Sequence, residues 1–316
     1  MSICAPKPFG SKFLKGGYSY WPLWWYGQKS KLHDMSGHGV DLTPSGAYFD
    51  GQGYFFDGSN DYLIDGDGRK VFREGTTGSW YSIYLTEGTV PAKGSIWGTG
   101  TRIKLNTAGT APKITGKIVL RPEYCPNLWY FDCGSNNITV LDASTVIGLR
   151  NLYCYGNNIS VLDISALTNL EYLNCRANYN ISVLDVSALT KLRSIHCDRN
   201  NISVLDVSAL TLLFYLNCRT NNISTLDVSA LTNLTTLECY SNNISLLDVS
   251  AITGLSTLKC QNNSMNQDMV DTVLCDMDSH GTSGGTLWIQ GNAAPSATGV
   301  ACRDNLVSRG WSVTTD

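Results

Sequence analysis

The chain contains 316 residues, of which 43% are hydrophobic and 16% are charged, and its formal net charge is −3. This length allows two or three structural units with a sizeable apolar core. The sequence has no basic stripe, which excludes nucleic acid as an expected partner. No apolar run is long enough to cross a bilayer, so membrane insertion is not expected either.

The N-terminal segment, residues 1–112, contains no internal repeat and is rich in Gly, Tyr and Trp. Its first residues lack the apolar stretch of a Sec signal, so the sequence predicts no export by that route. Runs with strand-forming composition lie at 47–50, 54–57, 62–64 and 80–85, and Asp-Gly pairs, which favour tight turns, occur between them. This pattern predicts an antiparallel β module.

The densest aromatic cluster of the chain lies in this segment and consists of Trp21, Trp24, Trp25 and Tyr26. One interpretation is that the cluster forms the core of the β module. The other is an assembly surface, because aromatic side chains are enriched at the centres of protein interfaces. In the second case the module would dock the chain to a larger, oligomeric assembly.

Residues 113–263 consist of a repeated phrase, approximately L-x-x-L-x-C-x-x-N-N-I-S-x-L-D-V-S-A-L-T. Its cysteine recurs every 21 residues, with one gap of 22 that contains an extra residue, Tyr179, expected to form a turn bulge. A period of about 20–29 residues on this pattern is typical of a leucine-rich repeat solenoid, in which each repeat adds a short parallel strand to a stack. The recurring cysteines are Cys133, Cys154, Cys175, Cys197, Cys218, Cys239 and Cys260.

The placement of these cysteines predicts free thiols. Each occupies a position where the repeat normally turns an apolar side chain inward, and a buried Cys behaves as a small hydrophobe. An odd row of stacked cysteines cannot pair completely, and reduced thiols are typical of proteins made in a reducing cytosol. No Cys-x-x-Cys pair occurs, so neither a zinc site nor any other metal or cofactor is expected.

Two polar residues recur at fixed places in the repeat. The first asparagine of each Asn pair, for example Asn200 before Asn201, is expected to satisfy backbone groups of the turn with its amide. The aspartate of each Leu-Asp-Val-Ser phrase is expected to hydrogen-bond amides of its own turn, although a row of carboxylates can also bind cations. These aspartates are Asp163, Asp185, Asp206, Asp227 and Asp248.

Residues 264–316 break the period and predict an αβ cap. Asn266 is a candidate N-cap, and the apolar residues that follow, such as Val270 and Leu274, recur at helical spacing. Such a cap would close the end of a solenoid, which otherwise exposes its core. The expected elements are a helix over 265–279, a strand over 286–290, a helix over 296–308 and a strand over 311–315.

The repeat region, with the phrase LDVSALTNLTTLECYSNNIS, resembles the leucine-rich repeat proteins of bacteria. The C-terminal stretch GTLWIQGNAAPSATGVACRDNLVSRGWSVTTD is similar to the cap that follows such repeats in bacterial and bacteriophage surface or tail proteins. Residues 33–64, HDMSGHGVDLTPSGAYFDGQGYFFDGSNDYLI, are similar to the opening of a concanavalin A-like (laminin G-type) module. The remainder of such a module is missing, so no sugar site is inferred from it.

These features together predict an α/β-type solenoid: leucine-rich repeats with short parallel strands, an N-terminal antiparallel β module and a C-terminal αβ cap. Alternation along each strand sends every second side chain to the concave surface. Six of the 21 positions expected there are tyrosines, and the mixture resembles an antibody paratope. Tyr and Thr also favour strands without any binding role. The residues expected to bind a ligand are Tyr130, Tyr153, Tyr155, Tyr172, Arg176, His196, Asp198, Tyr215, Arg219, Glu238 and Tyr240.

One pair on the expected concave surface, His196 with Asp198, has the residue types of an acid–base site. No nucleophile motif such as G-x-S-x-G accompanies it. The expectation is therefore a protein that is not an enzyme, and a glycan-degrading enzyme that uses this pair is kept as the third hypothesis.

The first hypothesis, which the resemblances and the predicted lack of an export signal imply, is a bacteriophage virion protein assembled in the host cytoplasm. Its N-terminal module would dock to other virion subunits. Its solenoid would bind a protein or glycan on a host surface, or cover neighbouring subunits. The alternative hypothesis is a recognition protein of the bacterial cell surface, which would need an export route.

Overall fold

The structure, a computed structural model, describes residues 128–316 throughout and, before them, the strands alone. Of the side chains in those earlier strands, only Ile118 and Leu120 are described, and both are fully buried. The chain divides into two compact units, Met1–Gly148 and Leu149–Asp316. Each unit is described by itself.

The first unit contains an antiparallel part and a parallel part. β3, β6, β7 and β8 pair in that order as an antiparallel sheet, and β4 pairs with β5 in the same way, as the sequence predicts. β11 pairs antiparallel with β8 and parallel with β13, so the change to parallel pairing occurs at β11. β10 likewise pairs antiparallel with β9 and parallel with β12. The strands are β1 (Leu23–Trp24), β2 (His33–Asp34), β3 (Leu42–Ser45), β4 (Tyr48–Phe49), β5 (Tyr54–Phe55), β6 (Tyr62–Asp65), β7 (Lys70–Arg73), β8 (Trp80–Leu85), β9 (Ser95–Trp97), β10 (Arg102–Asn106), β11 (Thr115–Leu120), β12 (Tyr130–Asp132) and β13 (Asn137–Asp142).

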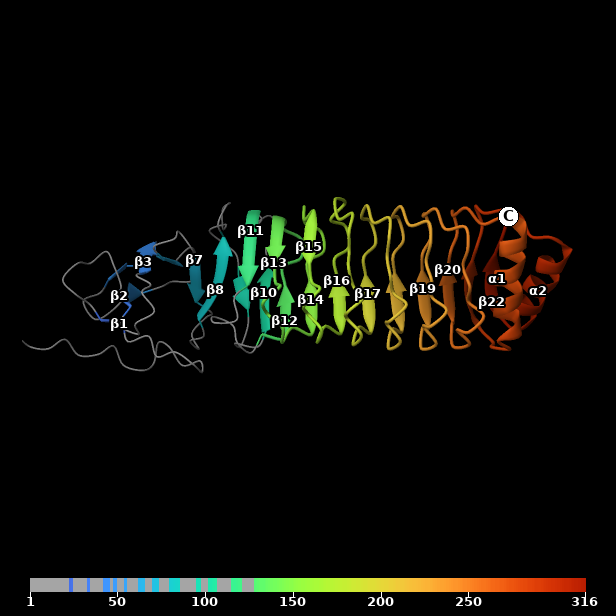
Figure 1. The fold of residues 1–316 in the computed structure, drawn as a ribbon, viewed down its shortest axis with the longest axis horizontal. Helices are drawn as coiled ribbons and strands as arrows, with labels where there is room; N and C mark the ends of the chain where they lie inside the picture. The colour runs from blue at the N-terminus through green and yellow to red at the C-terminus, as the bar shows by residue number, and fades with distance from the viewer. Residues whose placement is uncertain are drawn as a thin grey trace, which may run out of the picture. The chain divides into compact units, whose positions relative to one another are not determined.

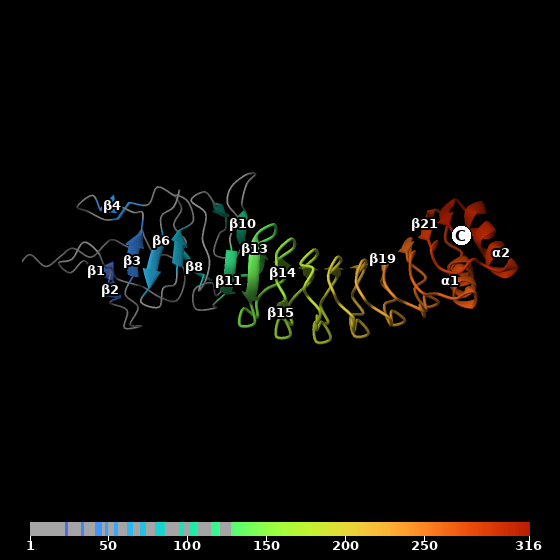
Figure 2. The same cartoon turned by 90° about the horizontal axis from the view of Figure 1, so that it is seen from above.

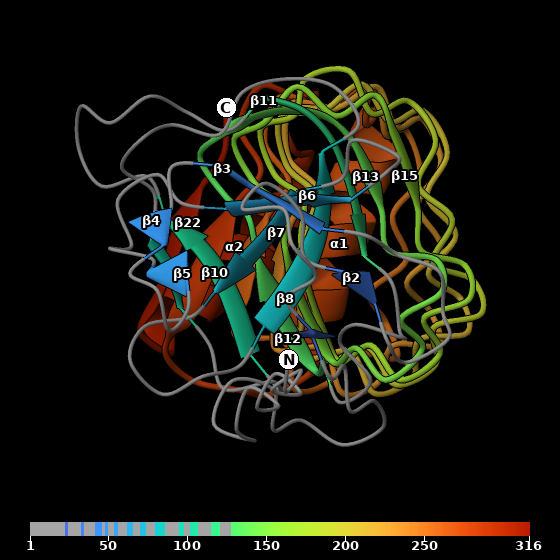
Figure 3. The same ribbon diagram turned by 90° about the vertical axis from the view of Figure 1, so that its left-hand side faces the viewer.

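The second unit is a solenoid whose coils each contribute one short parallel strand (Figure 1). Viewed from above, these strands follow the concave side of an arc (Figure 2), and viewed along the stack the coils lie behind one another (Figure 3). A short strand of the return segment, β15 (Val161–Asp163), lies outside this row. The stacked strands are β14 (Asn151–Tyr153), β16 (Tyr172–Asn174), β17 (Ser194–His196), β18 (Tyr215–Asn217), β19 (Thr236–Glu238), β20 (Thr257–Lys259), β21 (Gly285–Trp288) and β22 (Trp311–Thr314).

The interior of the second unit is filled by the apolar residues of the repeat. In the coil that contains β18, Leu216 points inward and is fully buried, as are Cys218, Ile223 and Leu213. Full burial of one large aliphatic side chain contributes about 1.5–3 kcal/mol, but a single coil has no partner surface on which to bury its residues. Stacking therefore supplies the core, as expected for a repeat protein.

The recurring turn of each coil is held by its first asparagine, as predicted. Asn221 Nδ2 donates to the carbonyls of Cys218 at 3.0 Å and Cys197 at 3.1 Å, and its Oδ1 accepts from the Ile202 amide at 3.0 Å. One side chain thus closes its own turn and joins it to the preceding coil. The residue before it, Thr220, has a φ of 54°, and the corresponding position of every described coil is also left-handed.

The extra residue of the 22-residue repeat lies in this turn, as the spacing predicts. Tyr179 has a φ of 62°, a second left-handed residue two positions after Ala177, and the residue is 61% exposed. The asparagine between them, Asn178, keeps its bonds to the Cys154 and Cys175 carbonyls. The insertion therefore bulges into solvent without interrupting the stack.

The row of aspartates has the predicted structural role. Asp206 Oδ1 accepts from the backbone amide of Ser208 at 3.0 Å and from its hydroxyl at 2.7 Å. The same pair of bonds occurs at Asp163, Asp185, Asp227 and Asp248. The serine hydroxyl and amide lower the pKa of the carboxyls at 185, 206, 227 and 248.

All seven recurring cysteines are buried free thiols, as predicted. Burial raises the pKa of Cys175 and of Cys260 to about 12, and it raises that of Cys197, Cys218 and Cys239 well above the usual value. At neutral pH each of these residues is therefore a protonated, apolar component of the core.

The C-terminal end of the solenoid is covered by α1 (Gln267–Ser279) and α2 (Ala297–Ser308), which pack on each other (Figure 1). Asn266 caps α1, since its Oδ1 accepts from the Met269 amide at 2.9 Å, and Val270 and Leu274 are buried as predicted. β21 and β22 follow their helices and extend the parallel sheet. The two helices and two strands of the cap begin and end within two residues of their expected bounds.

Candidate functional site

The outward side chains of the stacked strands form three columns on the concave side of the second unit. Register joins Tyr153, Asn174, His196, Asn217 and Glu238 in one column, while the leucine or isoleucine before each of them is buried. The concave face is defined here as these three columns between β14 and β21, which pass through Tyr172, Asn174 and Arg176 on the coil of β16. It brings together Tyr153, Tyr155, Tyr172, Arg176, His196, Asp198, Tyr215, Arg219, Glu238 and Tyr240.

One expected site residue lies outside this face, and one expected cluster lies outside the described residues. Tyr130 belongs to β12 of the first unit, where its ring packs edge-on against Trp129 with 5.9 Å between centroids. The cluster Trp21, Trp24, Trp25 and Tyr26 lies outside the described residues, apart from the backbone of Trp24 in β1. The proposed assembly surface stays a prediction.

The C-terminal half of the concave face, which consists of Asp198, Asn217, Arg219, Glu238 and Lys259, is linked by its own charges. Arg219 Nε lies 3.3 Å from Asp198 Oδ2, and its Nη1 lies 3.9 Å from Glu238 Oε2. Lys259 Nζ lies 2.9 Å from Glu238 Oε1, and Asn217 Nδ2 donates to Glu238 Oε2 at 2.9 Å. Each charged group therefore has an opposite charge on an adjacent coil.

Aromatic rings complete this half of the face. Arg219 lies 5.3 Å from the centroid of the Tyr240 ring and donates to the Tyr240 hydroxyl. Lys259 Nζ lies 5.0 Å above the ring of Trp288, which continues the central column on β21. The cations are thus held between carboxylates and rings, an arrangement that fixes their side chains.

His196 and Asp198 do not form an acid–base pair. The Asp198 carboxylate, with 2% of its side chain exposed, pairs with Arg219. The His196 ring stacks on Tyr215 with 4.5 Å between centroids and 29° between planes. Desolvation lowers the pKa of His196, and the Asp198 charge opposes that effect. In this geometry His196 contributes a ring face, and Asp198 contributes a structural charge.

The remaining residues of the concave face, called its N-terminal half here, are Tyr153, Tyr155, Tyr172, Arg176 and the His196–Tyr215 stack, and they differ from the first group. The two groups meet on the coils of β17 and β18, which contribute residues to both. Arg176 is exposed and lies 5.5 Å from the centroid of the Tyr155 ring. Among the described residues, no carboxylate forms an ion pair with its guanidinium. This half presents half-buried aromatic rings and one exposed cation.

Within the described part of the chain, no group of His, Cys, Asp or Glu is arranged to hold a metal ion. The helices found there, α1 and α2, are too short and too polar to cross a membrane.

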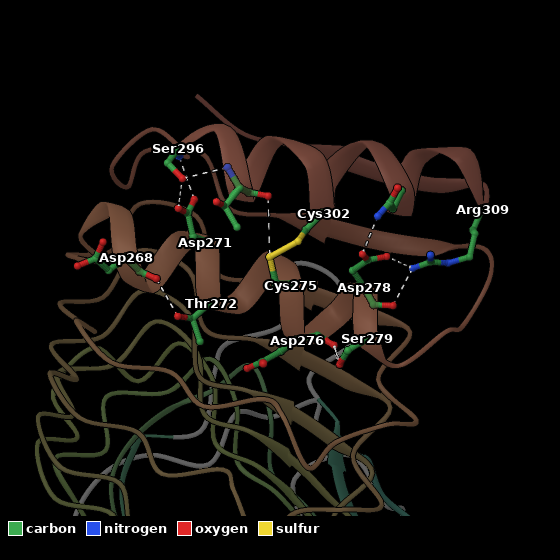
Figure 4. The surroundings of a disulfide bond; sticks show 12 residues. Asp268, Asp271, Thr272, Cys275, Asp276, Asp278, Ser279, Ser296, Cys302 and Arg309 are labelled. Carbon is green, nitrogen blue, oxygen red and sulfur yellow. Dashed lines mark hydrogen bonds and ion pairs between the residues drawn. A yellow bond between two sulfur atoms is a disulfide. The ribbon is translucent and has the colours of Figure 1, made fainter.

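Two features of the second unit were not predicted from the sequence. A disulfide joins Cys275 of α1 to Cys302 of α2 (Figure 4), with their Cα atoms 5.0 Å apart. The signal was present, because both cysteines fall outside the 21-residue period and in helices expected to form one cap. Asp278, close by, also binds Arg309 across the cap.

The other missed feature is one further coil turn in the cap. Ile289 occupies the place of the recurring cysteine, and Asn292 takes the place of the turn asparagine, with Nδ2 bonds to Ile289 and Cys260 carbonyls at 2.7 and 3.1 Å. The sequence L-W-I-Q-G-N matches the L-x-C-x-x-N part of the repeat phrase, and this match could have extended the face to Trp288.

Stacked parallel strands, inward leucines and an asparagine row together define a leucine-rich repeat solenoid, and solved structures support this class. The functional domain of InlJ from Listeria monocytogenes, described as including a cysteine ladder, is 35% identical with a TM-score of 0.50. The match covers 55% of this chain and 37% of that one. A leucine-rich repeat protein of Leptospira interrogans has the same fold, with a TM-score of 0.51 at 19% identity, and the match covers 63% of this chain and 57% of that one.

The chain thus spans 37% and 57% of the lengths of these two proteins. No protein-family model matches the sequence, and no curated protein matches it either. Both solved structures come from bacteria. The expectations of a bacteriophage virion protein and of a concanavalin A-like module find no support in them.

Proposed function

We propose that this chain is a recognition protein of a bacterial cell surface, and that it binds a partner protein through the concave face. The observation that carries the proposal is the arrangement of that face. Half-buried tyrosines project outward from the paired strands β14, β16 and β18, on a framework fixed by the asparagine bonds between coils. Rigid aromatic side chains on a rigid support lose little conformational entropy on binding.

The disulfide favours an exported protein over a cytoplasmic one. Disulfides persist in oxidising compartments and are rare in the cytosol, and Cys275–Cys302 joins two half-exposed cysteines of the cap. The buried thiols agree with either location, because their high pKa and burial keep them protonated and unreactive. This is the physical reason for preferring the surface hypothesis to assembly in a reducing cytoplasm.

The experiment compares the full-length protein with Tyr172→Ala for binding to animal cells and to bacterial cells. A matched control is Val183→Ser, since Val183 is 74% exposed on the return segment, away from the concave columns. The proposal predicts saturable binding that is weakened about tenfold or more by Tyr172→Ala, as expected for an aromatic interface residue, and is unchanged by the control. Binding should be lost when the cells are treated with protease.

Two outcomes would contradict the proposal. Equal binding by Tyr172→Ala and by the unchanged protein would remove the concave face from the contact. Binding that survives protease but not glycosidase treatment would replace a protein partner with a glycan.

A further inference from the structure

The two halves of the concave face differ in how their charges are compensated. The C-terminal half contains Asp198, Arg219, Glu238 and Lys259, each of which has an opposite charge within 4 Å on an adjacent coil. The N-terminal half contains Arg176, which has no carboxylate partner among the described residues. The uncompensated charge of this face is therefore positive, although the whole chain has a net charge of −3.

The opposite edge of the same half also carries excess positive charge. Arg150 and Arg193 immediately precede β14 and β17, and both pair with the single carboxylate of Glu171, at 3.6 and 3.9 Å. Their side chains remain 62% and 50% exposed. Arg176 follows β16, so cations flank the tyrosines at both ends of the strands. The span from residue 171 to residue 176 along an extended strand is about 16 Å.

We infer that this N-terminal half of the concave face binds an acidic segment of the partner protein, and that Arg176 pairs with one of its carboxylates. The inference rests on the proposed function and specifies the chemistry of its partner. Arg176 is suited to this role because its guanidinium lies over the Tyr155 ring. A stacked guanidinium keeps its N–H edge free for two parallel bonds to a carboxylate.

The polar groups of the face favour a protein segment over a sugar. Recognition of sugar hydroxyls needs planar amides and carboxylates with free hydrogen-bonding capacity. Here both Glu238 oxygens bind Asn217 and Lys259, and the Asn174 oxygen accepts from the Arg176 amide at 3.3 Å. The groups that remain available include the Tyr172 ring and the Arg176 guanidinium. Tyr and Arg are the residue types enriched at the centres of protein interfaces.

Charge compensation also explains why the C-terminal half is not the expected contact. An incoming carboxylate would have to displace Asp198 or Glu238 from Arg219, and Asp198 is 2% exposed. Breaking a partly buried pair costs more than an exposed cation gains on pairing. The ion-pair network therefore directs acidic groups toward Arg176.

The test uses the full-length protein and synthetic peptides rich in Asp, Glu and leucine, together with matched peptides in which Asn and Gln replace the acids. Binding is measured by titration calorimetry at low and at high salt for the unchanged protein, Arg176→Gln, Tyr172→Ala and a control, Arg303→Gln. Arg303 is an α2 residue that pairs only with its neighbour Asp304 in the described structure. Unfolding curves establish that each variant is folded.

The inference predicts that acidic peptides bind at least tenfold more tightly than their amide counterparts, and that salt weakens this binding. Arg176→Gln should reduce the affinity about tenfold, while Arg303→Gln leaves it unchanged. Absence of binding by every acidic peptide, or equal effects of Arg176→Gln and Arg303→Gln, would overturn the inference. Binding of an acidic polysaccharide in place of the peptides would also overturn it.

The recognition function and the acidic partner can be wrong independently of each other. If Tyr172→Ala weakens cell binding while Arg176→Gln and the acidic peptides have no effect, the recognition function stands and the acidic partner is wrong. If neither substitution changes cell binding, the concave face is not the contact and both proposals are wrong.

Discussion

Asp198 and Arg219 are one repeat apart in the chain and form an ion pair across two adjacent coils, with 3.3 Å between Arg219 Nε and Asp198 Oδ2. The pair lies on the surface expected to bind, yet it links the protein to itself. In this solenoid, an outward charged side chain lies next to the equivalent position of the adjacent coil, and it can pair with a side chain there instead of with a ligand. Whether a concave residue is available therefore depends on which residue follows it one period later.

Removing one member of this pair should destabilise the solenoid. Asp198→Ala leaves Arg219, whose side chain is 23% exposed, with only the more distant Glu238 carboxylate. We expect a loss of about 1–3 kcal/mol, less than for a fully buried pair because Arg219 retains solvent contact. Urea unfolding of Asp198→Ala, Arg219→Ala and the double variant measures this. The losses of the two single variants should add up to more than the loss of the double variant. A sum equal to the loss of the double variant would mean that the pair is not coupled.

The turn asparagines should contribute more than their neighbours. Asn221→Ala removes bonds to two carbonyls and one amide and leaves these buried backbone groups without a partner. An unsatisfied buried group costs about 1–3 kcal/mol, so we expect a loss of about 2–4 kcal/mol in the free energy of unfolding. Asn222→Ala, at the exposed next position, is the matched control and should cost less than about 1 kcal/mol. Equal losses would show that the asparagine row does not hold the coils together.

The buried thiols predict a loss of stability in alkaline solution. A thiol whose pKa is higher in the folded than in the unfolded protein favours folding fully below the unfolded value, and this contribution is lost as the pH rises. Between the usual value of 9.0 and the folded value of about 12 for Cys175 and Cys260, each such thiol should lower stability by about 1.4 kcal/mol per pH unit.

Urea unfolding at about pH 8 and about pH 10.5 should show this decline. Cys175→Ala should make the decline in stability smaller by the contribution of one thiol. The variant should also be less stable at both pH values, because the substitution leaves a small cavity. A pH dependence identical to that of the unchanged protein would mean that Cys175 ionises freely in the folded state.

Reduction of the disulfide should loosen the cap. Cys275–Cys302 closes a loop with a sequence separation of 27 residues, for which the loop-entropy model gives about 3–4 kcal/mol. With a reducing agent, amide exchange should accelerate in α1 and α2 and remain slow in the middle coils, because a solenoid transmits stability mainly between neighbours. The variant Cys275→Ala/Cys302→Ala should reproduce the effect without reductant. Unchanged exchange in both helices would contradict this role.

The repeat region was predictable from sequence because its signal is periodic. A constant spacing of 21 residues fixes which leucines point inward, and the register of Tyr153, Asn174 and His196 follows from it directly. The helices of the cap were predictable for a local reason, since Asn266 and the apolar spacing after it define one element without reference to the rest.

The contacts between coils were not predictable to the same degree. From the sequence, His196 and Asp198 were considered together as a possible acid–base pair. In the structure Asp198 pairs with Arg219 one coil later, and His196 stacks on Tyr215. These choices depend on side-chain lengths and directions across the stack. The same limitation explains why Asp198, Arg219 and Glu238 were expected to bind in the same way as Arg176, whereas the structure shows that their charges pair with one another.

The most direct test of the account is hydroxyl-radical footprinting of the full-length protein with and without bound cells or partner. The account predicts protection of Tyr153, Tyr155 and Tyr172, with no change at Val183 and Val204 on the return segments, which are 74% and 70% exposed. Protection of the two valines with unchanged modification of the three tyrosines would place the contact on the other side of the solenoid and contradict the account.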